Sequence, residues 1–333
     1  MMIETDLFKK TLEAFAVGDA MGMPLEFMTG NYIRERFGIV DELIDPSKLE
    51  DSIHSNLEKG SITDDTEQNL YLIEEYCKTG RIDTASTVSG LIRWIEERKP
   101  ERKGYIGPST LESLKRILEG EKPEKAGFGK TTCGSAMRIL AVVFCSGRLN
   151  EDELVRIIHS SCIPTHNTNI AFESSLTLGM AYHMLILGCD LNDIMDKMKN
   201  IPEMMEKIDV PRFVGASTVD RILNLAEFSS RIRSDEDFLD FLYGVVGTTM
   251  EANEVVPVSF LIFLRSGDDV WEAIRLGASV GGDTDTISAI AGALSTLYAK
   301  DHNIPKATVD EVVERNGLNL ERYAGMIEKI WNV

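Results

Sequence analysis

The chain has 333 residues, and its 35 Lys and Arg against 54 Asp and Glu give a net charge of −19. This charge excludes a general nucleic-acid binder, which needs a basic surface to displace counterions from phosphates, and it disfavours docking on an anionic membrane. Hydrophobic residues make up 43% and charged residues 27%, which is typical of a folded globular protein.

No uninterrupted apolar run reaches the roughly 18 residues needed to span a bilayer, and the first residues lack the pattern of a secretory signal. The five cysteines form no CxxC pair, which favours reduced thiols over a disulfide framework or a zinc site; they are Cys77, Cys133, Cys145, Cys162 and Cys189. We therefore expect a cytoplasmic protein without a membrane segment, and a monomer by default.

The first predicted helix carries Phe8 and Phe15 on one face, and Gly18 is expected to end it. The segment GDAMGMPLEF begins there, and its small residues permit close backbone packing. Asp19 is interpreted as a helix-end acid. Glu26 is either a solvated loop acid or a catalytic group, and this segment alone leaves both readings open.

The second helical pattern opens with two adjacent carboxylates, Asp64 and Asp65, between the hydroxyls of Thr63 and Thr66. One interpretation is a helix N-cap, because acids are favoured at the positive end of a helix. The other is an ion site, because side chains at a helix start splay differently from those within it, so neighbouring acids can reach one ion or two.

Apolar stripes predict further helices at 88–95, 111–118 and 154–158, with a loop at 120–130 between the second and third. Residues 167–188 are apolar almost all round, which predicts a central helix buried by the others.

Two weaker motifs lie in this middle part of the chain. Gly134 and Ser135 follow a glycine-rich loop and form either a phosphate cradle or a plain loop-to-helix junction. His166 precedes the central helix and is either a structural hydrogen-bonding group or a contact to a phosphate or ribose.

The last polar motif is GGDTDT, directly before an apolar helix. Gly281 and Gly282 permit unusual backbone angles, so that Asp283 and Asp285 can converge on one point. A helix cap alone would need only one acid. It would not need a hydroxyl such as that of Thr286 directly after the second acid.

Alternating strand patterns are nearly absent, so the sequence predicts an all-α fold of a dozen or more helices, without an obvious linker, as one domain over residues 1–333. If the fold brings the two acidic helix starts together, they offer only hard oxygen ligands, which suits two Mg²⁺ or Mn²⁺ ions better than zinc or copper. The ligand set would be Thr63, Asp64, Asp65, Asp283, Asp285 and Thr286.

In this order, the motifs resemble those of the ADP-ribosylglycohydrolase family, which includes the dinitrogenase-reductase-activating glycohydrolases. The matching segments are GDAMGMPLEF at 18–27, TDDT at 63–66, GSAMR at 134–138, TH at 165–166 and GGDTDTISAIAGAL at 281–294. Together they span about residues 7–300.

The resemblance implies a compact multi-helix orthogonal bundle with two Mg²⁺ (or Mn²⁺) ions at the base of a cleft. It implies metal ligands at the six positions given above and catalytic carboxylates at Glu26, Asp65 and Asp285. It places substrate contacts at Phe27, Tyr105, Gly134, Ser135 and His166.

The third motif departs from the family pattern, because Thr131–Cys133 replace the usual amide and glycine. Tyr105 stands where the nitrogenase-regulating members carry an acid, so their preference for arginine linkages does not transfer directly.

The resemblance implies Mg²⁺-dependent cleavage between ribose C1″ and an acceptor, on an ADP-ribosylated protein or a small ADP-ribose conjugate. Two alternatives stay open: a non-catalytic crystallin-like or ADP-ribose-binding relative, and a Mg²⁺-dependent nucleotide phosphohydrolase.

Overall fold

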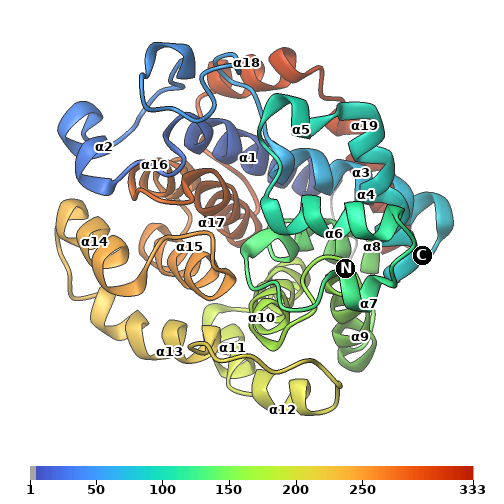
Figure 1. Cartoon of the computed structure of the whole chain (residues 1–333). Coiled ribbons are helices and arrows are strands. Elements are labelled where there is room, and N and C mark those ends of the chain that lie inside the picture. The colour runs from blue at the N-terminus through green and yellow to red at the C-terminus, as the bar shows by residue number, and fades with distance from the viewer. Residues whose placement is uncertain (1–4, 333) are drawn as a thin grey trace.

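The computed structural model describes residues 5–332, which form 19 α-helices and, within that range, no strand (Figure 1). The all-α prediction is therefore confirmed, whereas the prediction of one domain stays a prediction. The first nine helices are α1 (Thr5–Gly22), α2 (Gly30–Phe37), α3 (Asp64–Thr79), α4 (Thr84–Arg98), α5 (Pro100–Lys103), α6 (Pro108–Leu118), α7 (Pro123–Ala126), α8 (Ile139–Ser146) and α9 (Glu151–Cys162).

The remaining helices are α10 (Asn169–Leu187), α11 (Leu191–Met198), α12 (Ile201–Glu206), α13 (Thr218–Ser229), α14 (Asp235–Phe241), α15 (Ala252–Ser266), α16 (Val270–Ser279), α17 (Thr284–Ala299), α18 (Lys306–Asn316) and α19 (Leu320–Trp331). Short 3₁₀ turns cover Met23–Leu25, Pro46–Lys48 and Cys133–Ser135, and a π-helical turn covers Leu242–Val246.

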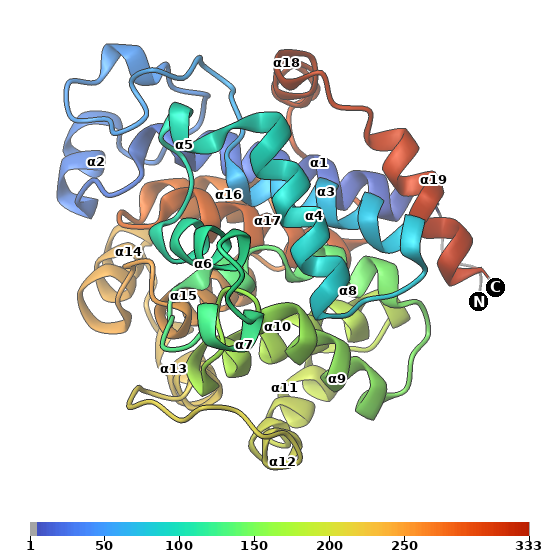
Figure 2. The same cartoon turned by 45° about the vertical axis from the view of Figure 1, so that its right-hand side comes forward.

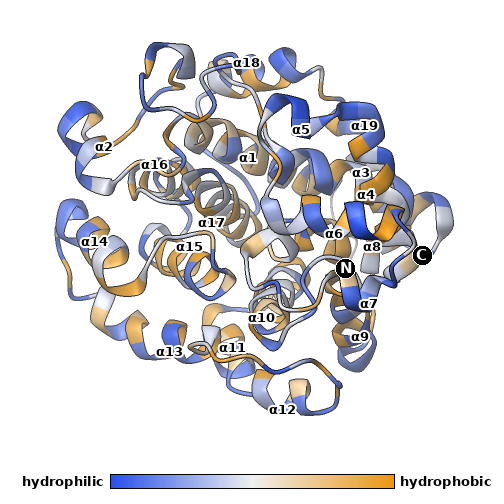
Figure 3. Cartoon of the chain, viewed as in Figure 1, coloured by the Kyte–Doolittle hydropathy of each residue, from blue (hydrophilic) through white to orange (hydrophobic). Residues whose placement is uncertain are grey.

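Helix α10 is the predicted central helix, and the prediction is confirmed. It is long and apolar enough to cross a membrane by length and composition, but 83% of its apolar window is buried inside the fold. Buried side chains of this kind belong to a core helix, and Figure 3 shows hydrophobic residues concentrated on inner helices such as α15, with hydrophilic ones on outer helices such as α5.

Helices α1 and α17 pack closely along each other at the centre of the fold (Figure 1). A Cβ atom added to Gly18 would lie 2.6 Å from the Cα of Ala289, and one added to Gly22 would lie 2.3 Å from the carbonyl oxygen of Thr284. The prediction that Gly18 ends the first helix is therefore wrong, because this glycine serves helix packing and α1 continues to Gly22.

We expect Gly22→Ala to lower the free energy of unfolding by about 1–3 kcal/mol or more, because the added methyl group collides with the backbone of α17. The matched control is Gly325→Ala in α19, where an added Cβ meets nothing within 4 Å. That change should raise the free energy of unfolding by about 1 kcal/mol, because alanine has a higher helix propensity than glycine. Urea unfolding of both variants checks the pair, and equal effects would contradict the packing argument.

Candidate active site

Asp19, on the buried face of α1, fixes the start of α3. Its carboxylate accepts bonds from the backbone N–H groups of Thr63 (3.0 Å) and Thr66 (3.1 Å) and from both threonine hydroxyls (2.9 and 2.6 Å). Thr63 is the N-cap residue of α3, and its hydroxyl also accepts from the N–H of Asp65. Asp64 and Asp65, the next two residues, are thus held in the first turn by a fully buried acid.

The start of α17 is fixed by two glycines in the left-handed region. Gly281 and Gly282 have φ of +87° and +83°, and a Cβ on Gly282 would lie 1.9 Å from the carbonyl oxygen of Thr248. The N–H of Asp283 donates to that same oxygen (2.8 Å). The predicted role of the glycines is therefore confirmed, since only they permit this close approach.

These two helix starts meet at the base of one cleft. Nine of the predicted site residues line it: Glu26, Phe27, Asp64, Asp65, Tyr105, Gly134, Asp283, Asp285 and Thr286. Thr63 is buried and does not line the cleft, and its hydroxyl donates to Asp19.

The buried carboxylates raise one another's pKa. Burial is the main cause at Asp64, Asp65 and Asp285, whose pKa values lie well above the ordinary value, and neighbouring carboxylates add to it. Burial and the charge of Glu26 raise the pKa of Asp283 to about 6. Among the described residues that line the cleft there is no Lys or Arg to compensate these charges.

The donor set fits divalent cations. Asp65 Oδ1 is buried without a hydrogen-bond partner, which is costly unless a proton or a cation reaches it. The carboxylate and hydroxyl oxygens that converge here are ligands that Mg²⁺ and Mn²⁺ prefer. The buried Cys133 thiol also lies among them and donates to Asp283 Oδ2 (3.1 Å). Asp64 is oriented by Gln68, whose Nε2 donates to its Oδ2 (3.0 Å).

We expect Asp283→Asn to stabilise the metal-free protein increasingly as pH rises. The folded pKa of about 6 exceeds the reference value of 3.8, so the folded state holds this proton more tightly. Its favourable contribution is complete below 3.8 and is lost as pH rises through 6. Thermal melts of both proteins without metal, from about pH 4.5 to about pH 7, measure the difference, which should widen with pH. A constant difference would contradict the burial of this charge.

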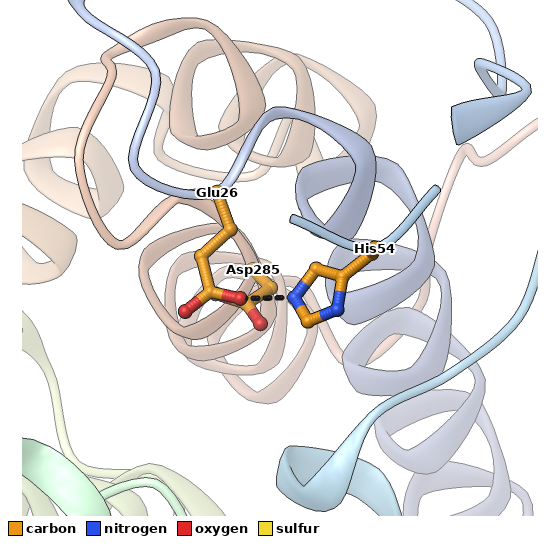
Figure 4. Close-up of side chains that lie close together, drawn as sticks. All are labelled: Glu26, His54 and Asp285. Atoms are coloured by element: carbon orange, nitrogen blue, oxygen red, sulfur yellow. Dashed lines mark hydrogen bonds and ion pairs between the residues drawn. The ribbon is translucent and has the colours of Figure 1, made fainter. Parts of the chain in front are cut away.

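Glu26, His54 and Asp285 form a second cluster over the acidic base. Their nearest ligand atoms all lie within 4.8 Å of one another, and His54 Nε2 is hydrogen-bonded to the Glu26 carboxylate (Figure 4). The His54 side chain is 1% exposed, and its Nδ1 has no partner. Glu26 therefore points into the cleft, and the interpretation of Glu26 as a solvated loop acid is wrong.

The segment that carries Glu26 is tied down on two sides. The N–H of Phe27 donates to the carbonyl oxygen of Gly282 (2.7 Å), and Phe27 itself has a φ of +62°, which is strained for a bulky residue. On the other side, the Ser52 hydroxyl donates to the carbonyl oxygen of Pro24 (2.9 Å). Strain of this kind persists only where the surroundings impose it, and such positions cluster at active sites.

Tyr105 forms one wall of the cleft and is held from behind by Glu67. Its hydroxyl donates to Glu67 Oε2 (2.8 Å), which also accepts from Trp94 Nε1 (2.8 Å). Arg98 pairs with the same carboxylate. Burial, and then the charge of Glu67, raise the pKa of Tyr105, so its hydroxyl stays protonated at physiological pH.

Ser135 and His166 lie behind the cleft and do not line it. The Ser135 hydroxyl shares a hydrogen bond with Ser175 (2.9 Å), and His166 is fully buried. A Cβ on Gly134 would lie 2.6 Å from His166 Cε1, so the histidine packs directly under the Gly134 backbone. Direct substrate contact by either side chain stays a prediction.

A buried chain of hydrogen bonds nevertheless connects His166 with the cleft wall. Thr132 donates its single hydroxyl proton to Ser109 (3.0 Å), so it accepts from His166 Nε2 (2.9 Å), which carries the ring proton. In the neutral ring Nδ1 then accepts from the Thr165 hydroxyl (2.7 Å), to which Arg138 also donates. Burial and the charge of Arg138 lower the pKa of His166, consistent with a neutral ring.

Comparison with known proteins decides the family. The model of the ADP-ribosylglycohydrolase family matches residues 3–332, nearly the whole chain. The chain belongs to this family. An uncharacterised protein of Archaeoglobus fulgidus is 28% identical over 313 residues, 93% of each chain. The ADP-ribosylarginine hydrolase Tri1 of Serratia proteamaculans is 24% identical, covering 98% of this chain and 79% of its own.

Among solved structures, an ADP-ribosylglycohydrolase-related protein complex has the same fold, with a TM-score of 0.71, 21% identity and coverage of 99% of both chains. The resemblance inferred from the motifs is therefore confirmed. The family and its named relatives are hydrolases, and this chain is therefore a hydrolase as well.

Sequence reasoning missed His54, Ile53 and Met250, which all line the cleft. His54 lies in an irregular stretch between two helices, where no period or motif marks a buried side chain. Its burial follows only from the contact between this stretch and the segment that carries Glu26.

Proposed function

We propose that this protein is a Mg²⁺-dependent ADP-ribosyl hydrolase with a binuclear metal site, which cleaves the bond between ribose C1″ and an acceptor. One observation carries the proposal: two acidic helix starts, more than 200 residues apart in sequence, put four buried carboxylates at the base of one cleft. Mn²⁺ is the alternative ion, because it accepts the same oxygen ligands.

Asp64, Asp65 and Thr63 would hold one side of the metal pair, and Asp283, Asp285 and Thr286 the other. Two bound ions would supply the orientation of vicinal ribose hydroxyls and a water molecule of lowered pKa. Glu26 lies beside Asp285, within reach of the cleft, and would accept a proton from an attacking water molecule or assist the leaving group. Tyr105 and Phe27 confine the sugar from the sides of the cleft.

The diphosphate needs partners other than basic side chains, since none lines the cleft. Ser109 and Thr110 lie in the first turn of α6, where backbone N–H groups have no partner within the helix. Gly134 presents backbone directly beside Thr110, without the amide side chain usual in the family. These two elements are the ones suited to the phosphates.

The test is a substrate panel with Arg-, Ser- and O-acetyl-linked ADP-ribose, with Mg²⁺, with Mn²⁺ and with a chelator. We expect free ADP-ribose as the product and loss of activity in the chelator. Release of AMP or phosphate would indicate a nucleotide phosphohydrolase instead. Absence of both turnover and ADP-ribose binding in calorimetry would indicate a non-catalytic relative.

The substrate in this proposal is an ADP-ribosylated protein or a small ADP-ribose conjugate. A strongly acidic surface favours acceptors other than nucleic acid, because phosphates are repelled at long range. We propose that the protein acts as a monomer in the cytoplasm, and sedimentation at micromolar concentration tests the first part.

A further inference from the structure

Two cysteines outside the cleft lie in contact. Cys77, in the last two turns of α3, has its sulfur 3.9 Å from that of Cys145, near the end of α8. Cys77 is half-buried and Cys145 is buried. Helices α3 and α8 pack against each other, so the pair is a fixed feature of the fold rather than a chance contact between loops.

The exposed side of Cys77 opens into a surface groove between α3, α4 and α19, which lie together in Figure 2. Four cationic side chains line this groove: Lys78, Arg93, Arg322 and Lys329. Its single carboxylate, Glu74, is already shared between Arg93 (2.8 Å) and Arg322 (2.6 Å). Counted over the residues that line it, the groove has a charge of +3 on a chain whose overall charge is −19; Lys78 also pairs with Glu75 (3.9 Å), which does not line the groove.

We propose that this groove is a binding and reaction site for small anionic disulfides, which oxidise Cys77 and Cys145 to an internal disulfide. The inference is independent of the proposed function, because neither cysteine lines the catalytic cleft. The cationic groove supplies selectivity by concentrating anions beside Cys77, and the second thiol supplies the resolving step.

The reaction balances as a two-electron exchange. The Cys77 thiolate attacks one sulfur of the bound disulfide, forming a mixed disulfide and expelling one thiolate. Cys145 then attacks the Cys77 sulfur, transfers its proton to solvent and expels the second thiolate. Two protein thiols are oxidised and one small disulfide is reduced to two thiols. The protein sulfurs must approach from 3.9 Å to about 2.05 Å, which requires rotation of the half-buried Cys77 side chain.

The order of events follows from accessibility. Cys145 is buried and cannot meet a dissolved disulfide first, and burial raises the pKa of its thiol. Its hydrogen bond to Cys77 lowers the pKa of the Cys77 thiol, which favours the outer cysteine as the attacking group. Cys189 is the natural control within the chain, because it is also half-buried but has Asp190 and Asp193 beside it.

The experiment compares oxidised glutathione, which is anionic, with cystamine, which is cationic, at equal concentration and low salt. Peptide mass spectrometry follows each cysteine with time. We expect oxidised glutathione to modify Cys77 roughly tenfold faster than cystamine does, with the difference shrinking in high salt. The final product should be the Cys77–Cys145 disulfide without bound glutathione.

Two variants, checked for folding by circular dichroism, make the test decisive. In Cys145→Ala, a glutathione adduct should persist on Cys77, whereas in Arg322→Gln/Lys329→Gln the preference for the anionic disulfide should fall several-fold. The proposal is overturned if cystamine reacts as fast as oxidised glutathione in the wild type. It is also overturned if Cys189 reacts as fast as Cys77, or if no Cys77–Cys145 cross-link forms.

Discussion

Replacing Asp285 with Asn should abolish hydrolysis while raising the thermal midpoint of the metal-free protein. Asp285 is 3% exposed, and its pKa is raised by burial and by the charges of Glu26, Asp65 and Asp283. The amide keeps the side-chain shape and removes one of these repelling charges, so the empty site becomes less costly to fold. The same change removes a ligand, so we expect activity to fall by at least about 100-fold, with loss of the Mg²⁺-induced rise in thermal midpoint.

Melting curves with and without Mg²⁺, together with turnover of the substrate that the panel identifies, give both readouts. Asp51→Asn is the matched control, because Asp51 is exposed and makes no ion pair among the described residues. It should leave the midpoint, the response to Mg²⁺ and the rate unchanged. A variant at Asp285 that kept full activity and the full Mg²⁺ response would refute the metal mechanism.

The acidic site could be predicted from sequence because its signal is local and repeated. Asp64 and Asp283 each belong to a short Thr/Asp cluster at the start of an apolar helix, and only their meeting in space required the fold. The prediction for Gly18 is wrong for a physical reason, since glycine both ends helices and permits close packing, and the sequence does not distinguish these uses.

Other features depend on contacts between distant segments and leave no pattern in the sequence. His54 meets Glu26 only because its irregular stretch packs against the segment that carries Glu26, and Cys77 meets Cys145 only because α3 and α8 pack together. His166 precedes the central helix, but its position under Gly134 depends on the backbone path of the third motif, and its predicted contact with substrate stays a prediction.

Replacing Glu26 with Gln should lower kcat by roughly 100- to 10,000-fold, the range expected for loss of a general acid or base. Because Glu26 is not among the proposed metal ligands, the Mg²⁺-induced shift in thermal midpoint should persist. This combination distinguishes Glu26 from Asp285, whose replacement removes both properties. If Glu26→Gln retained wild-type kcat, the proton would have to pass through an aspartate of the ligand set instead.

His54 should act through Glu26 as a positioning residue. His54→Ala removes the hydrogen bond that holds the carboxylate over the cleft, so we expect kcat to fall about tenfold with little change in KM. His54→Gln can still donate to Glu26 and should recover part of the rate. The matched control is His302→Ala, because His302 pairs with Glu13 (3.1 Å) away from the cleft. Only His54 lies beside Glu26, the group proposed to handle the proton. Equal loss of kcat in both alanine variants would therefore mean that His54 serves stability alone.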